Sequence, residues 1–547
     1  MTTSAAILSA GAPRARPLAG QPLVRALGAL VSLPMLCGYV YLGLGLFLML
    51  GLGSYAGDAL ARTASALYVV LSRDPHLAAI GFVWNPLPSI VQIPLVLALD
   101  PFGLAHLAGP IQSAAFGAGS VFILDRILRL LGTGTWRRRA LLLAYGLDPI
   151  IVFYGANGMS ESPLIFFMLA ATHQFVRWAR GGPYSTLIFF ALLSAGTFLV
   201  RYEGIAFAAA GILGLTAAFL FGKDLNPDRL EAILLTYTAP ISYVVALWIF
   251  FNWILVGDPL HFYRSSYGNV ALTAGFRSGG ETYLSGAVGS IAGSAAYAAV
   301  QSAYVFPASV LIAALAAIRG LLRKEHVTLG VLGFALSLPA FHAYLVYSGT
   351  SFGWLRFFIY CVPFSFVLLP LVLEPLRGTR PAWIAGWAIS FALILVSWPA
   401  SLFALADPNH GREEAGIVAH LIDPTRNPLP ASYTFGTDKE IARYVDGLPP
   451  GTVVLMDSAL AFSIDLFARD HRRYAITNDR DFPQILDRPD GGAVTHILVT
   501  RRSDSEAVGA ALPGLWQAGA AYATLERDFG GPDRWRLYRV HPAEEGR

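Results

Sequence analysis

Long hydrophobic stretches alternate with short polar loops over roughly the first 400 residues of the chain. Each stretch is long enough to form a helix across the hydrocarbon core of a bilayer, where backbone groups must be paired within the chain. About eleven spans are predicted, near residues 27–52, 107–131, 138–155, 160–179, 184–200, 203–222, 231–256, 291–318, 327–347, 354–374 and 382–404. The pattern predicts a polytopic α-helical membrane protein.

One apolar segment, PLPSIVQIPLVLAL at residues 86–99, is too short to cross a bilayer comfortably and contains three prolines. We expect it to lie in the membrane interface. If it does not cross, the positive-inside rule is satisfied, because the basic loops then all face the cytoplasm: 125–139, 177–182, 222–229, 319–326 and 374–380. The chain is then a multi-pass protein of the inner (plasma) membrane, with loops 53–106 and 256–290 outside.

After residue 404 the sequence becomes polar and rich in proline, aspartate and arginine. Strands are predicted at 452–458, 496–501 and 534–540, and a helix at 440–448. We therefore divide the chain into a membrane domain at 1–404, a linker at 405–435 and an extracytoplasmic α/β domain at 436–547. The expected role of that last domain is a structural or acceptor-docking cap.

Composition agrees with this class. Hydrophobic residues make up 55% of the chain and charged residues 14%, and the mean hydropathy is +0.55. A soluble protein has closer to a quarter of charged residues. A net charge of +4 is too small to indicate nucleic-acid binding, and both cysteines lie in apolar stretches, so no disulfide framework is expected.

Ionisable residues at the outer ends of the predicted helices are the candidates for chemistry. Such groups are costly at a membrane unless they are paired or functional. The candidate site residues are Asp58, Arg73, Asp74, His76, Glu161, Arg201, Glu203, His261, Arg264 and Arg356.

Each candidate also has a structural interpretation. Asp58 could cap the amphipathic helix that follows it, and Asp74, which precedes a proline, could be a turn residue. Arg201 and Glu203 could pair with each other. Glu161 could interact with its helix dipole. His261 and Arg264 could lie on the rim of a cavity.

Five motifs occur in a characteristic order along residues 1–404. They are Gly57-Asp58 after the first span, WNPLPSIVQIPLVLALDPFG (84–103), YGANGMSESPLIFF (154–167), LVRYEG (199–204) and GWLRFFIYCVPF (353–364). This arrangement resembles the C-type (GT-C) integral-membrane glycosyltransferases, in the branch of bacterial aminoarabinose transferase and the protein O-mannosyltransferases.

The resemblance implies an outer cavity, a polyprenyl-phosphate sugar as donor, and a glycan, lipid or protein as acceptor. It places the activating base on Asp58. We expect Arg201 and Arg356 to stabilise the departing phosphate, because guanidinium matches phosphate bidentately. Asp74, as a second catalytic acid, or Glu161 would orient the sugar or hold a divalent metal, Mg²⁺ or Mn²⁺.

Two positions depart from the family pattern. Ala59 stands where many relatives have a second acid, and Asn85 stands where a lysine often precedes the Pro-Leu segment. The lost phosphate contact would have to come from Arg73, His76, Arg201 or Arg356.

The sequence therefore predicts an inverting glycosyltransferase that acts on the outer face of the membrane. Two other classes stay open. A transporter or flippase of a lipid-linked sugar is disfavoured by the absence of an evident repeat and by the position of the acids at helix ends. A non-catalytic glycan-binding scaffold of the same fold is the other alternative.

Overall fold

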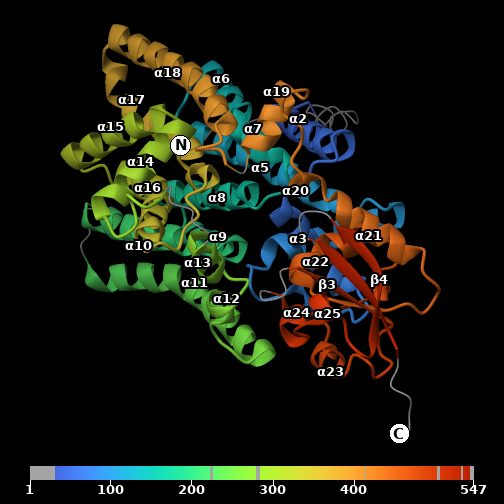
Figure 1. Ribbon diagram of the computed structural model, residues 1–547. Helices are drawn as coiled ribbons and strands as arrows, with labels where there is room; N and C mark the ends of the chain where they lie inside the picture. Colours follow the sequence, from blue (N-terminus) through green and yellow to red (C-terminus); the bar gives the residue numbers. More distant parts are fainter. Residues whose placement is uncertain are drawn as a thin grey trace, which may run out of the picture.

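The computed structural model describes residues 31–221, 226–278, 284–412, 414–501, 506–530 and 534–541. Long helices form a bundle, and a small sheet domain lies at one end of it (Figure 1). The predicted class, a polytopic helical protein with a small C-terminal α/β domain, is confirmed.

Within the described residues, each predicted span coincides with a helix or a pair of helices; residues 27–30 of the first span and 222 of the sixth lie outside them. The bundle contains α2 (Leu33–Leu46, continued by η1, Phe47–Gly51), α5 (Ala108–Leu130), α6 (Thr135–Gly146), α7 (Pro149–Ala156), α8 (Glu161–Ala179), α9 (Ser185–Val200), α10 (Gly204–Leu220), α11 (Pro227–Val256), α14 (Ile291–Val305), α15 (Ala308–Arg323), α16 (His326–Tyr347), η5 (Leu355–Phe358) with α17 (Cys361–Leu373), and α18 (Arg380–Ala406). Among the described residues, six helices are long and apolar enough to cross a membrane, or up to eight when two bent pairs are included.

Two spans predicted as single helices, 138–155 and 291–318, are broken. α6 and α7 meet at 60°, and α14 and α15 at 116°. Both breaks occur at a proline, Pro149 and Pro307, which has no N–H to donate and clashes with the preceding turn. At the first break Asp148 caps α7 by accepting a hydrogen bond from the Ile150 N–H.

The first outer loop folds into two helices, α3 (Gly57–Val70) and α4 (Leu87–Leu99), with η2 (Leu77–Ile80) between them. α4 has 13 residues. At 1.5 Å per residue it is about 20 Å long, short of the ~30 Å hydrocarbon core. Gln92 of α4 accepts a hydrogen bond from Thr63 of α3 and donates one to Gln112 of α5, so α4 is fixed against both.

The C-terminal domain contains a five-stranded mixed sheet in the order β2-β1-β3-β5-β4. The strands are β1 (Val454–Met456), β2 (Tyr474–Ile476), β3 (His496–Thr500), β4 (Ala523–Gly530) and β5 (Trp535–Val540). β1 pairs in parallel with β2 and β3, and β5 pairs antiparallel with β3 and β4. The predicted strands correspond to β1, β3 and β5, and the predicted helix to α21 (Gly436–Asp446); β2 and β4 were not predicted.

Shorter helices complete the chain. They are η3 (Asp100–Phe102), η4 (Ala105–Leu107), α12 (His261–Arg264), α13 (Asn269–Ser278), η6 (Glu374–Gly378), α19 (Ala415–Ile422), α20 (Ala431–Thr434), α22 (Ser458–Phe467), η7 (His471–Arg473), α23 (Phe482–Asp487), α24 (Ala507–Ala511) and α25 (Leu515–Ala518).

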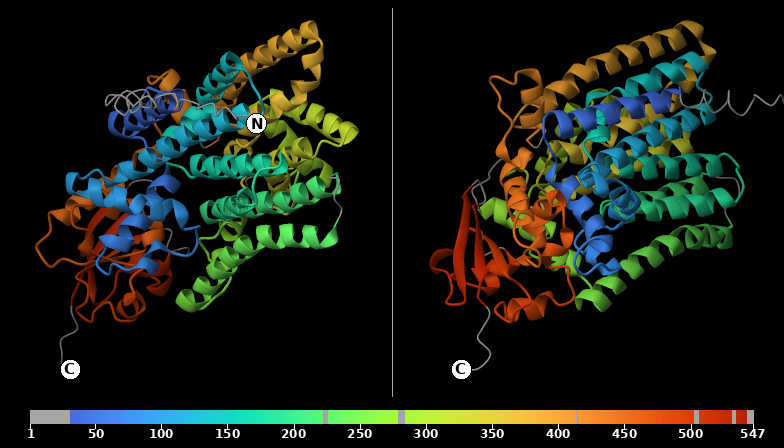
Figure 2. Two further views of the ribbon diagram at one scale, coloured as in Figure 1. Left: turned by 180° about the vertical axis from the view of Figure 1, so that it is seen from behind. Right: turned by 90° about the vertical axis from the view of Figure 1, so that its right-hand side faces the viewer.

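The C-terminal domain packs directly on the first outer loop. Leu60 and Leu67 of α3 share one buried apolar cluster with Ile441 of α21 and Ile464 of α22. His471 makes contacts of 2.8 Å with Asp465 of its own domain and Asp100 of the outer loop. The domain is therefore attached to the same end of the bundle as α3 (Figure 2).

The basic loops meet at the other end of the bundle. Arg377 donates to the Gly132 carbonyl, and Arg180 to the Leu130 carbonyl. Arg319 pairs with Glu325 at 2.8 Å and with Glu374 at 2.9 Å. Four of the five predicted basic loops therefore contact one another, and residues 222–225 of the fifth lie outside the described residues.

Candidate active site

Asp58 occupies the first turn of α3, directly after the first membrane helix. The chain reaches it through the π-helical turn η1 and Gly53, whose φ of +62° lies in the left-handed region that glycine adopts without strain. The Asp58 side chain is 41% exposed. Its backbone is therefore held in a helix, while its carboxylate is accessible from outside the bundle.

Arg356 lies at the centre of the site. Its Nη2 donates to Asp58 Oδ2 at 3.0 Å, and its Nε lies 3.9 Å from Glu161 Oε1. The guanidinium also lies 4.5 Å from the ring centroid of Trp354. The side chain is only 4% exposed. One buried cation thus joins α3, α8 and η5.

The Arg356 cation also determines the ionisation of Asp58. Burial alone would raise the pKa of Asp58, but Arg356 and then Arg62 outweigh burial and hold that pKa below its ordinary value. Asp58 is therefore ionised at neutral pH. Its Oδ2 is occupied by Arg356, which leaves Oδ1 as the oxygen able to accept a proton from a ligand.

Arg201 and Glu203 form the turn between α9 and α10. Arg201 donates to Glu161 at 2.7 Å and to Glu203 at 2.7 Å, so its charge is shared by two acids. Glu203 is buried and accepts hydrogen bonds from Nε and Nη2 of Arg201. His342 of α16 lies 3.8 Å from Glu203. The predicted pairing of Arg201 with Glu203 is confirmed.

Gly204 allows this turn to be tight. A Cβ at this position would lie 2.3 Å from the Thr197 carbonyl carbon. Only glycine permits that approach of α10 to the last turn of α9. The RYEG motif is thus a close hairpin that presents Arg201 and Glu203 to the site.

Arg62 was missed in the sequence but belongs to the site. It lies one helical turn after Asp58 in α3, and its guanidinium packs 4.8 Å from the Trp84 ring centroid. Its Nε and Nη1 are buried and have no hydrogen-bond partner among the described residues. The i, i+4 spacing from Asp58 places both on one helix face and was the available signal.

The two departures from the family pattern have structural reasons. Ala59 is buried against Gly158, where a Cβ would lie 3.0 Å from that of Ala59, so an acid has no room there. Asn85 is buried and donates a 2.6 Å hydrogen bond to the Phe198 carbonyl. Arg62 supplies a cation beside Asp58. It was not among the four residues proposed above to replace the missing lysine.

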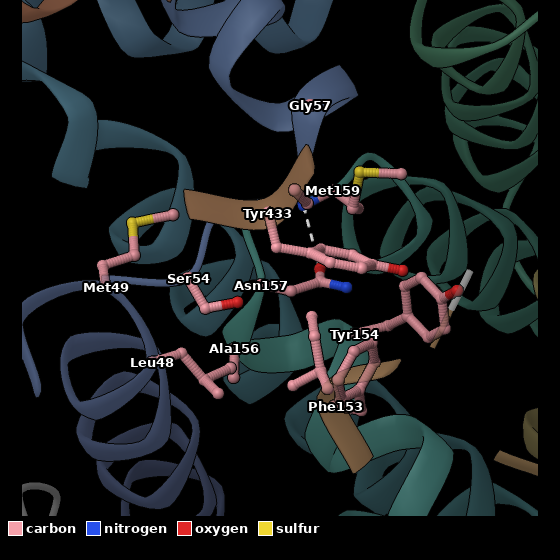
Figure 3. A pocket seen from close by; sticks show the side chains of 12 residues that line it. Leu48, Met49, Ser54, Gly57, Phe153, Tyr154, Ala156, Asn157, Met159 and Tyr433 are labelled. Atoms are coloured by element: carbon pink, nitrogen blue, oxygen red, sulfur yellow. Dashed lines mark hydrogen bonds between the residues drawn. The ribbon is translucent and has the colours of Figure 1, made fainter. Parts of the chain in front are cut away.

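A pocket adjoins Asp58 at the start of α3. It is lined by Leu48, Met49, Ser54, Ala56, Gly57, Phe153, Tyr154, Ala156, Asn157, Met159, Ile417 and Tyr433. Figure 3 shows the side chains of Tyr154, Asn157 and Tyr433 gathered in it. Ile417 and Tyr433 come from the predicted linker, so that segment forms part of the pocket wall.

Glu414 is a second acid that the sequence did not reveal. It is 1% exposed and accepts a hydrogen bond from the Tyr154 hydroxyl. Burial raises the pKa of Glu414 to about 7, against the opposing effects of Tyr154 and Arg356. No local motif marks this residue, because its partner Tyr154 is 260 positions away in the sequence.

Arg73 and Asp74 are placed elsewhere. Arg73 donates to Asp479 at 2.8 Å and also binds Asp481, and Asp74 accepts a hydrogen bond from Arg480 at 2.9 Å. Both therefore hold the C-terminal domain on the outer loop and do not join Asp58. The expected role of Asp74 as a second catalytic acid is corrected for this reason.

The remaining candidates also lie outside the cluster. His76 contacts the Asp74 carbonyl at 2.7 Å through Nδ1. Arg264 is 63% exposed and pairs with Asp258 at 3.2 Å, and His261 begins the same short helix, α12. We assign these three to the loop surface rather than to the charged centre.

The acids do not form a metal-binding set. Among the described residues, no group of three or more His, Cys, Asp or Glu side chains could hold a metal ion. Asp58 and Glu161 both face Arg356, so a guanidinium occupies the position between them. Among the described residues, the acids around Arg356 therefore do not fit a Mg²⁺ or Mn²⁺ ion.

No family model matches the sequence, and no curated protein matches it. The solved structures that resemble the chain include ArnT from Cupriavidus metallidurans bound to undecaprenyl phosphate, at 12% identity and a TM-score of 0.49, covering 95% of this chain and 98% of that chain. The apo form of ArnT gives 14% identity, a TM-score of 0.48 and the same coverage.

The archaeal oligosaccharyltransferase AglB from Archaeoglobus fulgidus, in complex with an inhibitory peptide and a dolichol-phosphate, gives 11% identity and a TM-score of 0.47. It covers 88% of this chain and 70% of that chain. Both are GT-C glycosyltransferases, the family that the sequence motifs resemble.

Proposed function

We propose that the protein transfers a sugar from a polyprenyl-phosphate donor to an acceptor hydroxyl. The observation that carries the proposal is the contact between Asp58, a partly exposed carboxylate, and Arg356, a buried guanidinium, at the outer end of a membrane bundle. A base and an anion-binding cation are the two groups that such a displacement requires. The donor class is supported by the sequence resemblance.

The reaction is written as a single inverting displacement. The acceptor hydroxyl gives its proton to Asp58, and its oxygen forms a bond to the anomeric carbon. The bond between that carbon and the phosphate oxygen breaks, and the phosphate keeps the electron pair. Its charge changes from about −1 to −2, so a cation is needed where that charge develops.

Arg356 and Arg62 are the proposed phosphate groups. Arg62 has buried donors without partners among the described residues, and Arg356 already contacts Asp58. Arg201 is assigned a different role, because two acids neutralise it. It holds Glu161 in place, and Glu161 in turn faces Arg356.

The proposed orientation rests on the position of the basic loops. The basic loops meet at one end of the bundle, and Asp58, the pocket and the C-terminal domain lie at the other. By the positive-inside rule the basic end faces the cytoplasm. We infer that the site works on the extracytoplasmic face of the inner membrane, where the lipid tail stays in the bilayer.

The proposal is tested with the full-length protein in liposomes and a panel of undecaprenyl-phosphate-linked sugars. We expect release of undecaprenyl phosphate from at least one donor and inverted anomeric configuration in the product, measured by NMR. Protein-free liposomes are the control. Absence of release from every donor would contradict the proposal, and retained configuration would exclude the single displacement.

A further inference from the structure

Glu414 comes from the linker, yet its side chain is enclosed in the membrane domain. Its Oε1 accepts the Tyr154 hydrogen bond, and its Oε2 is buried without a hydrogen-bond partner among the described residues. A hydrogen bond that joins the linker to α7 needs only one acceptor oxygen. A buried acid with an unpaired oxygen lowers the stability of the fold. A purely structural contact between the linker and α7 therefore does not explain why a carboxyl group occupies this position.

The groups that act on Glu414 come from three elements. Tyr154 of α7 donates the hydrogen bond, Arg356 of η5 attracts the carboxylate, and Glu161 of α8 repels it. Arg356 also binds Asp58 on another side. Glu414 therefore acts on the same guanidinium that the proposed reaction uses for the departing phosphate.

The charge of the cluster depends on the Glu414 proton. Among the described residues, the cations of this cluster are Arg62, Arg201 and Arg356, and its acids besides Glu414 are Asp58, Glu161 and Glu203. An ionised Glu414 would add a further negative charge that interacts with Arg356. That charge would compete with the phosphate for Arg356 and would raise the barrier to its departure.

We propose that Glu414 is a positioning residue of the transferase site, which holds Tyr154 at the pocket and, in its neutral form, keeps Arg356 available to the leaving phosphate. This inference rests on the proposed function. The pocket that Tyr154 lines, with Asn157 and Tyr433, then receives the acceptor. Its mixture of aromatic rings and an amide suits a hydroxyl-bearing ring such as a sugar.

The test measures donor hydrolysis by the full-length protein in liposomes, with the undecaprenyl-phosphate sugar that the panel identifies. Because Glu414 titrates near pH 7, we expect kcat to fall about tenfold per pH unit above that value. Glu414→Gln, which stays neutral, should lack this fall between about pH 7 and 9. Tyr154→Phe should lower kcat at pH 6 with little change in the donor KM.

Glu440→Gln is the matched control, because Glu440 pairs with Arg527 on the surface of the C-terminal domain. It should keep the wild-type pH profile. The same decrease of kcat above pH 7 in Glu414→Gln and in the wild type would overturn the inference while leaving the transferase proposal intact.

A second measurement, thermal unfolding as a function of pH, does not depend on activity. The Glu414 pKa in the folded protein, about 7, lies above its ordinary value of 4.5. The folded state therefore binds more protons between these values, and stability falls as the pH rises from about 4.5 to 7. The thermal unfolding midpoint of the wild type should fall relative to Glu414→Gln over that window. A constant difference would contradict the buried neutral acid, and failure of every donor would end the positioning role together with the proposed function.

Discussion

At the scale of single residues, the site depends on one arginine shared among acids. Arg356 contacts Asp58 directly and lies 3.9 Å from Glu161. Asp58 could be identified from its motif after the first span. Glu414 and the partner of Asp74 could not, because each contact joins positions hundreds of residues apart and leaves no local pattern.

Arg62 provides a prediction at this scale. A charge-assisted hydrogen bond contributes about 1.5–3 kcal/mol, and each 1.4 kcal/mol is a factor of ten. Arg62→Gln should therefore raise the donor KM roughly ten- to a hundredfold in the hydrolysis assay. Arg264→Gln, which removes an exposed arginine paired with Asp258, is the control and should leave KM unchanged. An equal effect of both variants would remove Arg62 from the phosphate site.

At the scale of elements, helix ends carry the chemistry. Asp58 lies in the first turn of α3, and Glu161 starts α8. Arg201 and Glu203 join α9 to α10, and Arg356 precedes α17. The long hydrophobic stretches located the membrane helices. Those stretches could not show the breaks at Pro149 and Pro307, because a proline in a membrane helix is compatible with either a kink or a break.

The α9–α10 hairpin gives a prediction for this scale. Gly204→Ala would place a methyl group 2.3 Å from the Thr197 backbone and should destabilise the protein by about 1–3 kcal/mol. Gly43→Ala is the matched control, because nothing lies within 4 Å of a Cβ there. Thermal unfolding in detergent measures both. Equal midpoints would show that the hairpin is not as tight as described.

At the scale of the whole molecule, the C-terminal domain and the linker are parts of the site region rather than a separate unit. Apolar residues of α3 and α21 share one cluster, and Tyr433 lines the pocket. The sequence predicted the domain and most of its strands. It could not predict the docking face, because strand and helix patterns do not encode which loop a domain will cover.

His471 allows the docking to be tested. Burial lowers its pKa, but the hydrogen bonds that its ring donates to Asp100 and Asp465 outweigh burial and raise that pKa to about 10. The protonated histidine should stabilise docking fully below its ordinary pKa of 6.5, and this contribution should be lost as the pH rises to about 10. Proteolysis within residues 405–435 should therefore accelerate in the wild type over that window.

In His471→Gln that proteolysis should be fast already at pH 6.5 and change little with pH. His541→Gln is the control, because His541 is exposed and forms a 3.0 Å hydrogen bond with Thr524. It should behave as the wild type does. A pH-independent wild type would contradict the role of His471 in docking.

The central claim is that Asp58 accepts the proton of the acceptor during transfer from a polyprenyl-phosphate sugar. The most direct measurement is release of undecaprenyl phosphate by the wild type, Asp58→Asn and Asp258→Asn in the same liposomes. Asp258 is a matched outer acid that pairs with Arg264 away from the cluster. We predict at least a hundredfold loss of kcat in Asp58→Asn, of the order that general-base catalysis contributes, with donor binding retained and Asp258→Asn unaffected. Wild-type release by Asp58→Asn would contradict the account.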